Sequence, residues 1–253
     1  MKLLKKMLAV LALVPALALA NSGDFPLDKA PERTNMAALQ NGAKLFVNYC
    51  LNCHSASSMR YNRLRDLELT EEQIKENLLF TQDKIGGMMT TTLQPKDAKA
   101  WFGAVPPDLS VIARARSSGE GTGADWLYTY MRTFYKDDTR PTGWNNKVFP
   151  NVGMPHVLWE LQGVQVAKEE EIDDPHEHGK KIHHFAGFEM VKPGKMNKLE
   201  YETAVADLVA YMSWMAEPVA TKRRQLGVWV LMFMGLFALV AWRLNASYWK
   251  EVK

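Results

Sequence analysis

Residues 50–54 read Cys50-Leu51-Asn52-Cys53-His54, and this stretch holds both cysteines of the 253-residue chain. A C-x-x-C-H sequence is typical of c-type haem attachment. Two thiols three residues apart share one helical turn, so both can form thioether bonds with the vinyl groups of one porphyrin. His54 follows at once, which lets its imidazole coordinate the iron. The motif therefore predicts one covalently bound haem c held by Cys50, Cys53 and His54.

Two other uses of a C-x-x-C pair compete with this interpretation. A thioredoxin-like redox pair needs a strand-turn-helix setting, whereas residues 37–47 carry apolar side chains at helical spacing. Half of a zinc site needs a second pair of ligands at family spacing, and no second cysteine pair exists. The sequence therefore favours haem attachment.

A second axial ligand is expected, because iron that passes electrons commonly takes a methionine thioether, which raises its potential. The chain has fourteen methionines. Those at helical spacing, such as Met212 and Met215, are typical of core packing, and Met88–Met89 lies beside a glycine pair. Met154 differs, because Gly153-Met154-Pro155 belongs to an irregular stretch in which a loop could lay the sulfur over the ring. The residue pattern alone leaves the choice open.

The N-terminal twenty residues have the composition of a targeting segment. Three lysines precede the apolar run from Met7 to Ala20, which closes with Ala18-Leu19-Ala20. This is the pattern of a secretory signal peptide with an A-x-A cleavage site. The alternative is an uncleaved anchoring helix, for which the run is short and contains Pro15. We expect residues 1–20 to be a cleaved signal peptide.

Near the other end, the stretch from Leu226 to Trp242 carries no charge and has basic residues on both sides. It is just long enough to cross a bilayer, and tryptophans near its ends suit the membrane interfaces. The alternative is a buried core helix, which rarely ends in basic clusters on both sides. We expect a transmembrane anchor over 225–243.

The flanking charges are too evenly divided for the positive-inside rule to orient this span. A signal peptide would export everything between itself and the span. We therefore expect residues 21–221 to form a periplasmic domain and residues 244–253 a cytoplasmic tail, anchored in a bacterial inner membrane. The chain's formal charge of +3 includes +3 from residues 1–20 and +5 from residues 222–253, which leaves −5 on the exported domain. An acidic domain attracts a basic partner.

Two further segments of the exported domain have distinct patterns. Glu169 to His178 (EEEIDDPHEH) is densely acidic; it is either a docking face for a basic cytochrome c or a solvated loop, and a metal site there is disfavoured because nothing fixes ligand geometry. Lys198 to Ala216 carries apolar residues at helical spacing, so we expect a helix packed on the haem domain and closed by Pro218.

The chain resembles cytochrome c1, the haem-c subunit of the cytochrome bc1 complex, in its proteobacterial form. The resemblance covers nearly everything after residue 20, and the order of its markers is much more specific than C-x-x-C-H alone. It implies a mainly α fold, with a cytochrome c-like haem domain, long insertions and one C-terminal transmembrane helix. The markers are Cys50 to His54, the run from Gly103 to Ser110 (GAVPPDLS), Arg114-Ala115-Arg116, Gly153-Met154-Pro155 and the run from Trp214 to Pro218 (WMAEP).

The resemblance also implies roles for individual residues. Met154 becomes the second axial ligand, and Arg116 pairs with a haem propionate, for which a guanidinium offers a planar fork; the alternative for Arg116 is a solvated charge. Relatives often place a tyrosine hydroxyl near a propionate, but this chain has Trp126 after a longer glycine-containing loop. That propionate contact is left open.

A ligating histidine normally donates its other ring N–H to a carbonyl. The Pro106-Pro107 pair is expected to turn the chain near the haem edge, and we predict that the carbonyl of Pro106 or Pro107 accepts this hydrogen bond from His54. A structure with that nitrogen facing another group would refute the prediction.

The function implied by the resemblance is electron transfer, without catalysis by this chain alone. It would receive electrons from a Rieske iron–sulfur subunit, beside cytochrome b in a dimeric complex in membrane lipid, and pass them to a soluble or membrane-bound cytochrome c. The sequence has no P-loop or Ser/His/Asp arrangement, and nothing in it indicates nucleic acid. The rivals are the haem-c subunit of another membrane oxidoreductase, such as a dehydrogenase or nitric oxide reductase, and a haem peroxidase, which needs an open iron site.

Overall fold

The structure is a computed structural model that describes residues 25–173 and 181–251. The predicted signal peptide at 1–20 lies outside the described residues. The chain divides into two compact units, one ending at Ala216 and the other beginning at Glu217.

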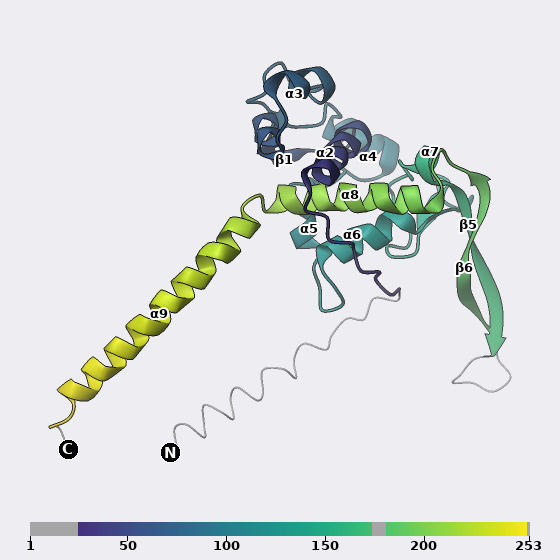
Figure 1. The fold of residues 1–253 in the computed structure, drawn as a ribbon. Helices are drawn as coiled ribbons and strands as arrows, with labels where there is room; N and C mark the ends of the chain where they lie inside the picture. The colour runs from purple at the N-terminus through teal and green to yellow at the C-terminus, as the bar shows by residue number, and fades with distance from the viewer. Residues whose placement is uncertain (1–24, 174–180, 252–253) are drawn as a thin grey trace. The chain divides into compact units, whose positions relative to one another are not determined.

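Helices predominate in the first unit, which confirms the predicted mainly α fold (Figure 1). Its helical elements are α2 (Met36–Leu45), the π-helix η2 (Phe46–Cys50), the 3-10 helix η3 (Tyr61–Leu67), α3 (Glu71–Asn77), α4 (Pro95–Phe102), α5 (Ile112–Ala115), α6 (Gly123–Arg132), α7 (Trp159–Gln162) and α8 (Lys198–Ala216). Its strands are β1 (Ala56–Arg60), β2 (Met88–Met89), β3 (Phe134–Lys136), β4 (Trp144–Asn146), β5 (Gly163–Asp173) and β6 (Lys181–Pro193). They pair antiparallel as β1–β2, β3–β4 and β5–β6.

The centre of this unit is the packing of α2 against α8 (Figure 1). The two helices approach each other closely at Gly42, where a Cβ atom would lie 2.1 Å from the carbonyl oxygen of Asp207 and 2.6 Å from the Cβ of Tyr211. One turn later, the ring of Phe46 lies 5.5 Å from that of Tyr211, and both rings are fully buried. The bounds of α8 confirm the helix predicted from Lys198 to Ala216. Because α8 fixes the end of α2, it also fixes the position of Cys50.

Residues 25–35, which precede α2, form no helix or strand, yet they are held against α6 and α8 by side-chain hydrogen bonds. The backbone N–H of Ala30 donates to Asp125 at 2.9 Å, and Arg33 donates to the carboxylate of Asp207 at 3.0 Å. Asp125 also completes a capping box with Thr122 at the start of α6. The two buried carboxylates therefore join the N-terminal segment to the helices behind it.

β5 and β6 form a long antiparallel ribbon that projects from the helical body (Figure 1). Its register runs from Gly163 opposite Pro193 to Asp173 opposite Lys181. Residues 169–173 of this acidic segment therefore belong to a strand and not to a solvated loop, whereas 174–178 lie outside the described residues. Lys147 contacts both strands of this ribbon. Its ammonium lies 4.6 Å from the ring centroid of Phe185 in β6 and 3.5 Å from the carboxylate of Glu169 in β5.

The second unit consists mainly of the long helix α9 (Ala220–Tyr248). The most apolar 18-residue window between Lys222 and Tyr248 has a mean hydropathy of 1.9, and none of that window is buried. Apolar side chains that are exposed along a whole helix suit a lipid environment. The predicted anchor at 225–243 lies within this helix, whose exposed apolar side chains favour a membrane span over a buried core helix.

Candidate functional site

The C-x-x-C-H motif begins at the last residue of the π-helix η2, which continues directly from α2. The N–H of Leu51 bonds the carbonyl of Phe46 at 3.0 Å, and the N–H of His54 then bonds the carbonyl of Cys50 at 2.8 Å. Single π turns within helices are frequently found at functional sites. The motif therefore follows a helix, as expected for haem attachment, and does not follow a strand.

The two thiols do not have the environment of a redox pair. Burial, with a further contribution from Cys53, raises the pKa of Cys50 to about 12, and burial also raises the pKa of Cys53. A thiol that exchanges disulfides needs a lowered pKa, because the thiolate is the nucleophile. Among residues 25–173 and 181–251, no group of three or more His, Cys, Asp or Glu side chains is placed to hold a metal ion. Neither alternative for the cysteine pair has support here.

The His54 ring is held by the proline-rich segment that follows α4. Its Nδ1 lies 2.7 Å from the carbonyl oxygen of Pro107. Burial lowers the pKa of His54, although the Pro107 carbonyl and the nearby Asp108 oppose this. In the neutral ring an Nδ1–H donates to the carbonyl, which leaves the lone pair of Nε2 free for a metal. Of the two predicted carbonyls, Pro107 makes the contact; Pro106 lines the cavity beside it.

Asp108 fixes the position of that carbonyl. Its carboxylate accepts hydrogen bonds from the backbone N–H groups of Ser57 and Ser110, each at 2.8 Å, and from the Ser57 hydroxyl. The N–H of Leu109 also bonds the carbonyl of Ser55 at 2.8 Å. Burial alone would raise the pKa of Asp108, but its hydrogen bonds outweigh this and lower the pKa. These hydrogen bonds hold the residues that follow His54 against the residues that follow Pro107.

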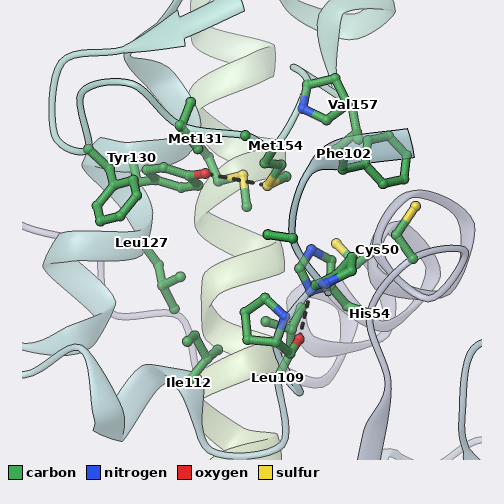
Figure 2. Close-up of a pocket in the computed structure, with 18 of the residues that line it drawn as sticks. Cys50, His54, Phe102, Leu109, Ile112, Leu127, Tyr130, Met131, Met154 and Val157 are labelled. Atoms are coloured by element: carbon green, nitrogen blue, oxygen red, sulfur yellow. Dashed lines mark hydrogen bonds between the residues drawn. The ribbon is translucent and has the colours of Figure 1, made fainter. Parts of the chain in front are cut away.

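The motif opens into a cavity of about 300 Å³. Figure 2 shows Cys50 and His54 on one side of this space, with Leu127 and Tyr130 on the other. Its lining is mostly apolar and includes residues from the proline-rich segment, α5, α6, α8 and the loop around Met154. The sequence-predicted residues Cys50, Cys53, His54, Pro106, Pro107, Arg116 and Met154 all line this one cavity.

Three methionines line the cavity, namely Met131, Met154 and Met212. Met131 and Met212 are buried on helices, whereas Met154 is partly exposed in a loop. Its Sδ accepts a hydrogen bond from the Tyr130 hydroxyl at 3.4 Å (Figure 2). Met89 is buried and lies outside this lining, with its sulfur 3.6 Å from the Tyr211 hydroxyl.

The loop that carries Met154 is built around two buried asparagines. The side-chain oxygen of Asn146 accepts hydrogen bonds from the N–H groups of Val148 and Phe149, at 2.9 and 3.1 Å. That of Asn145 accepts one from Asn151 at 2.8 Å. These bonds stand in for secondary structure and give the loop a defined path.

Arg116 is the cation of the cavity wall. Its guanidinium lies 4.4 Å from the Trp126 ring centroid and 5.6 Å from that of Phe149. No residue in the described part of the chain forms a hydrogen bond or ion pair with it. A guanidinium at a partly buried position, with its donors free, suits a carboxylate ligand. Trp126 also lines the cavity. This chain therefore has an indole at the cavity, where relatives were expected to have a tyrosine hydroxyl.

The residues present fit a covalently attached haem c. Two thiols, an imidazole with a free nitrogen and a thioether face one mostly apolar cavity, and at its wall stands a guanidinium that has no hydrogen-bond or ion-pair partner among the described residues. Imidazole with thioether is the ligand set of cytochromes c. Sequence reasoning missed Tyr130, Asn145 and Asn146. Only the spacing of Tyr130, one helical turn after Trp126, could have indicated its place on the same face of α6.

Comparison with known proteins assigns the class. The sequence matches the cytochrome C1 family over residues 25–178 and 189–252. It is 44% identical over 253 residues, all of both chains, to a Nitrosomonas europaea protein named ammonia monooxygenase gamma subunit. It is 43% identical to cytochrome c1 of Allochromatium vinosum over 96% of each chain. Cytochrome c1 of Rhodospirillum rubrum is 28% identical over 93% of this chain and 92% of its own. The chain therefore belongs to the cytochrome C1 family.

Proposed function

We propose that this chain is the haem-c electron-transfer subunit of a quinol–cytochrome c reductase. The haem is attached through thioethers to Cys50 and Cys53, and His54 and Met154 are its axial ligands. The observation that carries the proposal is the convergence of both thiols, this imidazole and this thioether on one apolar cavity. When bound, the haem supplies a one-electron change at its iron.

The protein's own residues orient and shield this group. The Pro107 carbonyl holds the Nδ1–H of His54, so the ring presents Nε2 to the iron. Arg116 pairs with a propionate and keeps that charge inside the wall of the cavity. The apolar lining excludes water, which favours electron transfer over ligand exchange. With both axial positions filled by the protein, no site is open to a substrate, so the chain is not catalytic alone.

The proposed partners follow from family membership and from charge. Cytochrome b and a Rieske iron–sulfur subunit share a dimeric complex with this chain in membrane lipid. The Rieske subunit delivers electrons, and a soluble or membrane-bound cytochrome c accepts them. The −5 charge of residues 21–221 favours a basic acceptor. The exposed apolar helix α9 supports a single membrane anchor.

We place residues 21–221 in the periplasm and residues 244–253 in the cytoplasm of a bacterium, after cleavage of residues 1–20. This orientation rests on the signal-peptide pattern. Fusion of alkaline phosphatase after residue 200 should give an active reporter, because that enzyme folds only in the periplasm. Activity confined to fusions at the C-terminal tail would contradict the orientation.

A second candidate has a specific observation in its favour. The relative with 44% identity carries the name ammonia monooxygenase gamma subunit, which suggests an electron-entry subunit of another membrane oxidoreductase. The same covalent haem and ligands would serve either complex. The partner proteins alone distinguish them.

Mild detergent extraction of native membranes, followed by purification on a tagged copy of this chain, tests the choice. We expect a multi-span protein with b-type haem spectra and a Rieske protein with its iron–sulfur electron paramagnetic resonance signal to purify with it. Recovery of the chain alone, or with an ammonia-oxidising enzyme, would overturn the reductase assignment. Carbon monoxide binding to the ferrous wild-type protein at neutral pH would instead indicate an open site, as in a peroxidase.

A further inference from the structure

The hydroxyl of Tyr130 is the polar group that meets Met154 inside the cavity. Tyr130 is only 6% exposed, and a buried phenol normally finds a hydrogen-bond partner. In the described part of the chain that partner is the Sδ of Met154, at 3.4 Å (Figure 2). The hydroxyl is therefore directed at the sulfur that the proposed function assigns to the iron.

The position of the Tyr130 ring is fixed by the rings around it. Trp126 stacks on it, with centroids 4.7 Å apart and planes 15° from parallel, and Trp126 is covered in turn by the Arg116 guanidinium. Phe134 meets the Tyr130 ring edge-on at 4.9 Å. Contacts of this kind restrict both the tilt and the displacement of a ring.

The same rings reach the loop that holds Met154. Phe134 is fully buried and stacks on the ring of His156, with centroids 4.9 Å apart and planes 7° from parallel. His156 follows Met154 by two residues. The rings in contact therefore form one continuous group that connects the donor of this hydrogen bond to the loop that carries its acceptor, so the bond follows from the fold.

The chemistry of a thioether allows both interactions at once. Its sulfur has two lone pairs, so one can coordinate a metal while the other accepts a hydrogen bond. A donor at that sulfur withdraws electron density from the metal and places the positive end of the O–H dipole nearby. Both effects stabilise the ferrous form over the ferric form, and hydrogen bonds to ligating atoms are known to tune such sites.

We propose that Tyr130 is a positioning residue that donates a hydrogen bond to the iron-bound sulfur of Met154 and thereby raises the reduction potential of the haem. This inference rests on the proposed function, in which Met154 is an axial ligand. It adds Tyr130 to the residues that act on the haem, and it predicts that this residue raises the reduction potential.

Tyr130→Phe in the full-length, haem-loaded protein removes the donor and keeps the ring in its stack. A single hydrogen bond shifts an equilibrium by roughly fivefold. The equilibrium constant for reduction should therefore fall by at most about fivefold, which is about 40 mV at 59 mV per tenfold for one electron. Tyr128→Phe is the matched control, since Tyr128 lies on the same helix and contacts Arg132 outside the cavity lining. Its potential should equal that of the wild type.

Proton NMR of the ferrous wild-type protein supplies a test that needs no variant. The methyl group of an iron-bound methionine is shifted strongly by the porphyrin ring current, and we expect a cross-relaxation peak between this methyl of Met154 and the protons of Tyr130. A shifted methyl without that peak, or a Tyr130→Phe potential equal to that of Tyr128→Phe, would overturn the inference and leave the ligation intact. Absence of any shifted methionine methyl would overturn the ligation and the inference together.

Discussion

Asp125→Asn should destabilise the haem domain by about 2 kcal/mol at neutral pH. The Asp125 carboxylate accepts hydrogen bonds from Lys29 Nζ at 2.8 Å, from the N–H of Ala30 at 2.9 Å and from the N–H of Thr122 at 3.0 Å. Burial alone would raise the pKa of Asp125, but these bonds outweigh it and lower the pKa from 3.8 to about 2. One pKa unit corresponds to about 1.4 kcal/mol between the two protonation states, which leads to the stated magnitude.

The pH dependence has a defined sign. The pKa of Asp125 is lower in the folded state than in the unfolded state, so the unfolded chain binds the extra proton as the pH falls. The stabilisation is complete above about pH 4 and is lost between about pH 4 and pH 2. The stability difference between wild type and Asp125→Asn should therefore shrink over this window.

Guanidinium unfolding of the full-length protein in detergent, followed by circular dichroism at several pH values, measures both quantities. Asp66→Asn is the control, because Asp66 pairs with Arg63 at 2.8 Å with both side chains about half exposed, and such surface pairs contribute about 0–1 kcal/mol. Equal stability of the two variants at pH 7, or a difference that does not shrink in acid, would refute the reasoning.

Gly42→Ala should lower the stability of the folded state by about 1–3 kcal/mol, because the new methyl group overpacks α2 against α8. Gly227→Ala is its control, because no atom lies within 4 Å of the new Cβ, and it should leave thermal unfolding unchanged. Equal losses of stability in the two variants would contradict this. Asp108→Ala should lower stability by about 1–2 kcal/mol, because it frees the segment that carries Pro107, and a melting curve like that of the wild type would count against the argument. Met154→Leu should let the ferrous protein bind carbon monoxide, seen as a shifted Soret band, whereas Met212→Leu should not; the reverse pattern would assign the ligand to Met212.

The common position of Cys50, Cys53 and His54 at one cavity could be predicted from the sequence, because the three residues are close together in the chain. Two thiols and an imidazole within five residues have the spacing that a porphyrin needs, whatever the rest of the fold. The helix from Lys198 to Ala216 could also be predicted, since helical periodicity is visible in a single segment. The exposed span in α9 follows from its uninterrupted apolar composition.

Features that depend on contacts between distant segments could not be predicted. The ribbon of β5 and β6 contains the charged run at 169–173, and its register depends on pairing with residues 181–193 and on Lys147. The path of the Met154 loop depends on Asn145 and Asn146, which look like ordinary turn residues in the sequence. The choice of Met154 itself needed the family resemblance, because the bare pattern left other methionines open.

The attachment of one haem to Cys50 and Cys53 is the central claim, and peptide mass measurement tests it most directly. The protein should be expressed with an intact cytochrome c maturation apparatus, digested, and the peptide containing residues 50–54 analysed under denaturing conditions. We expect that peptide to carry the mass of one haem through two thioether bonds, with no free thiol left. A peptide with two free or disulfide-linked cysteines would contradict the claim.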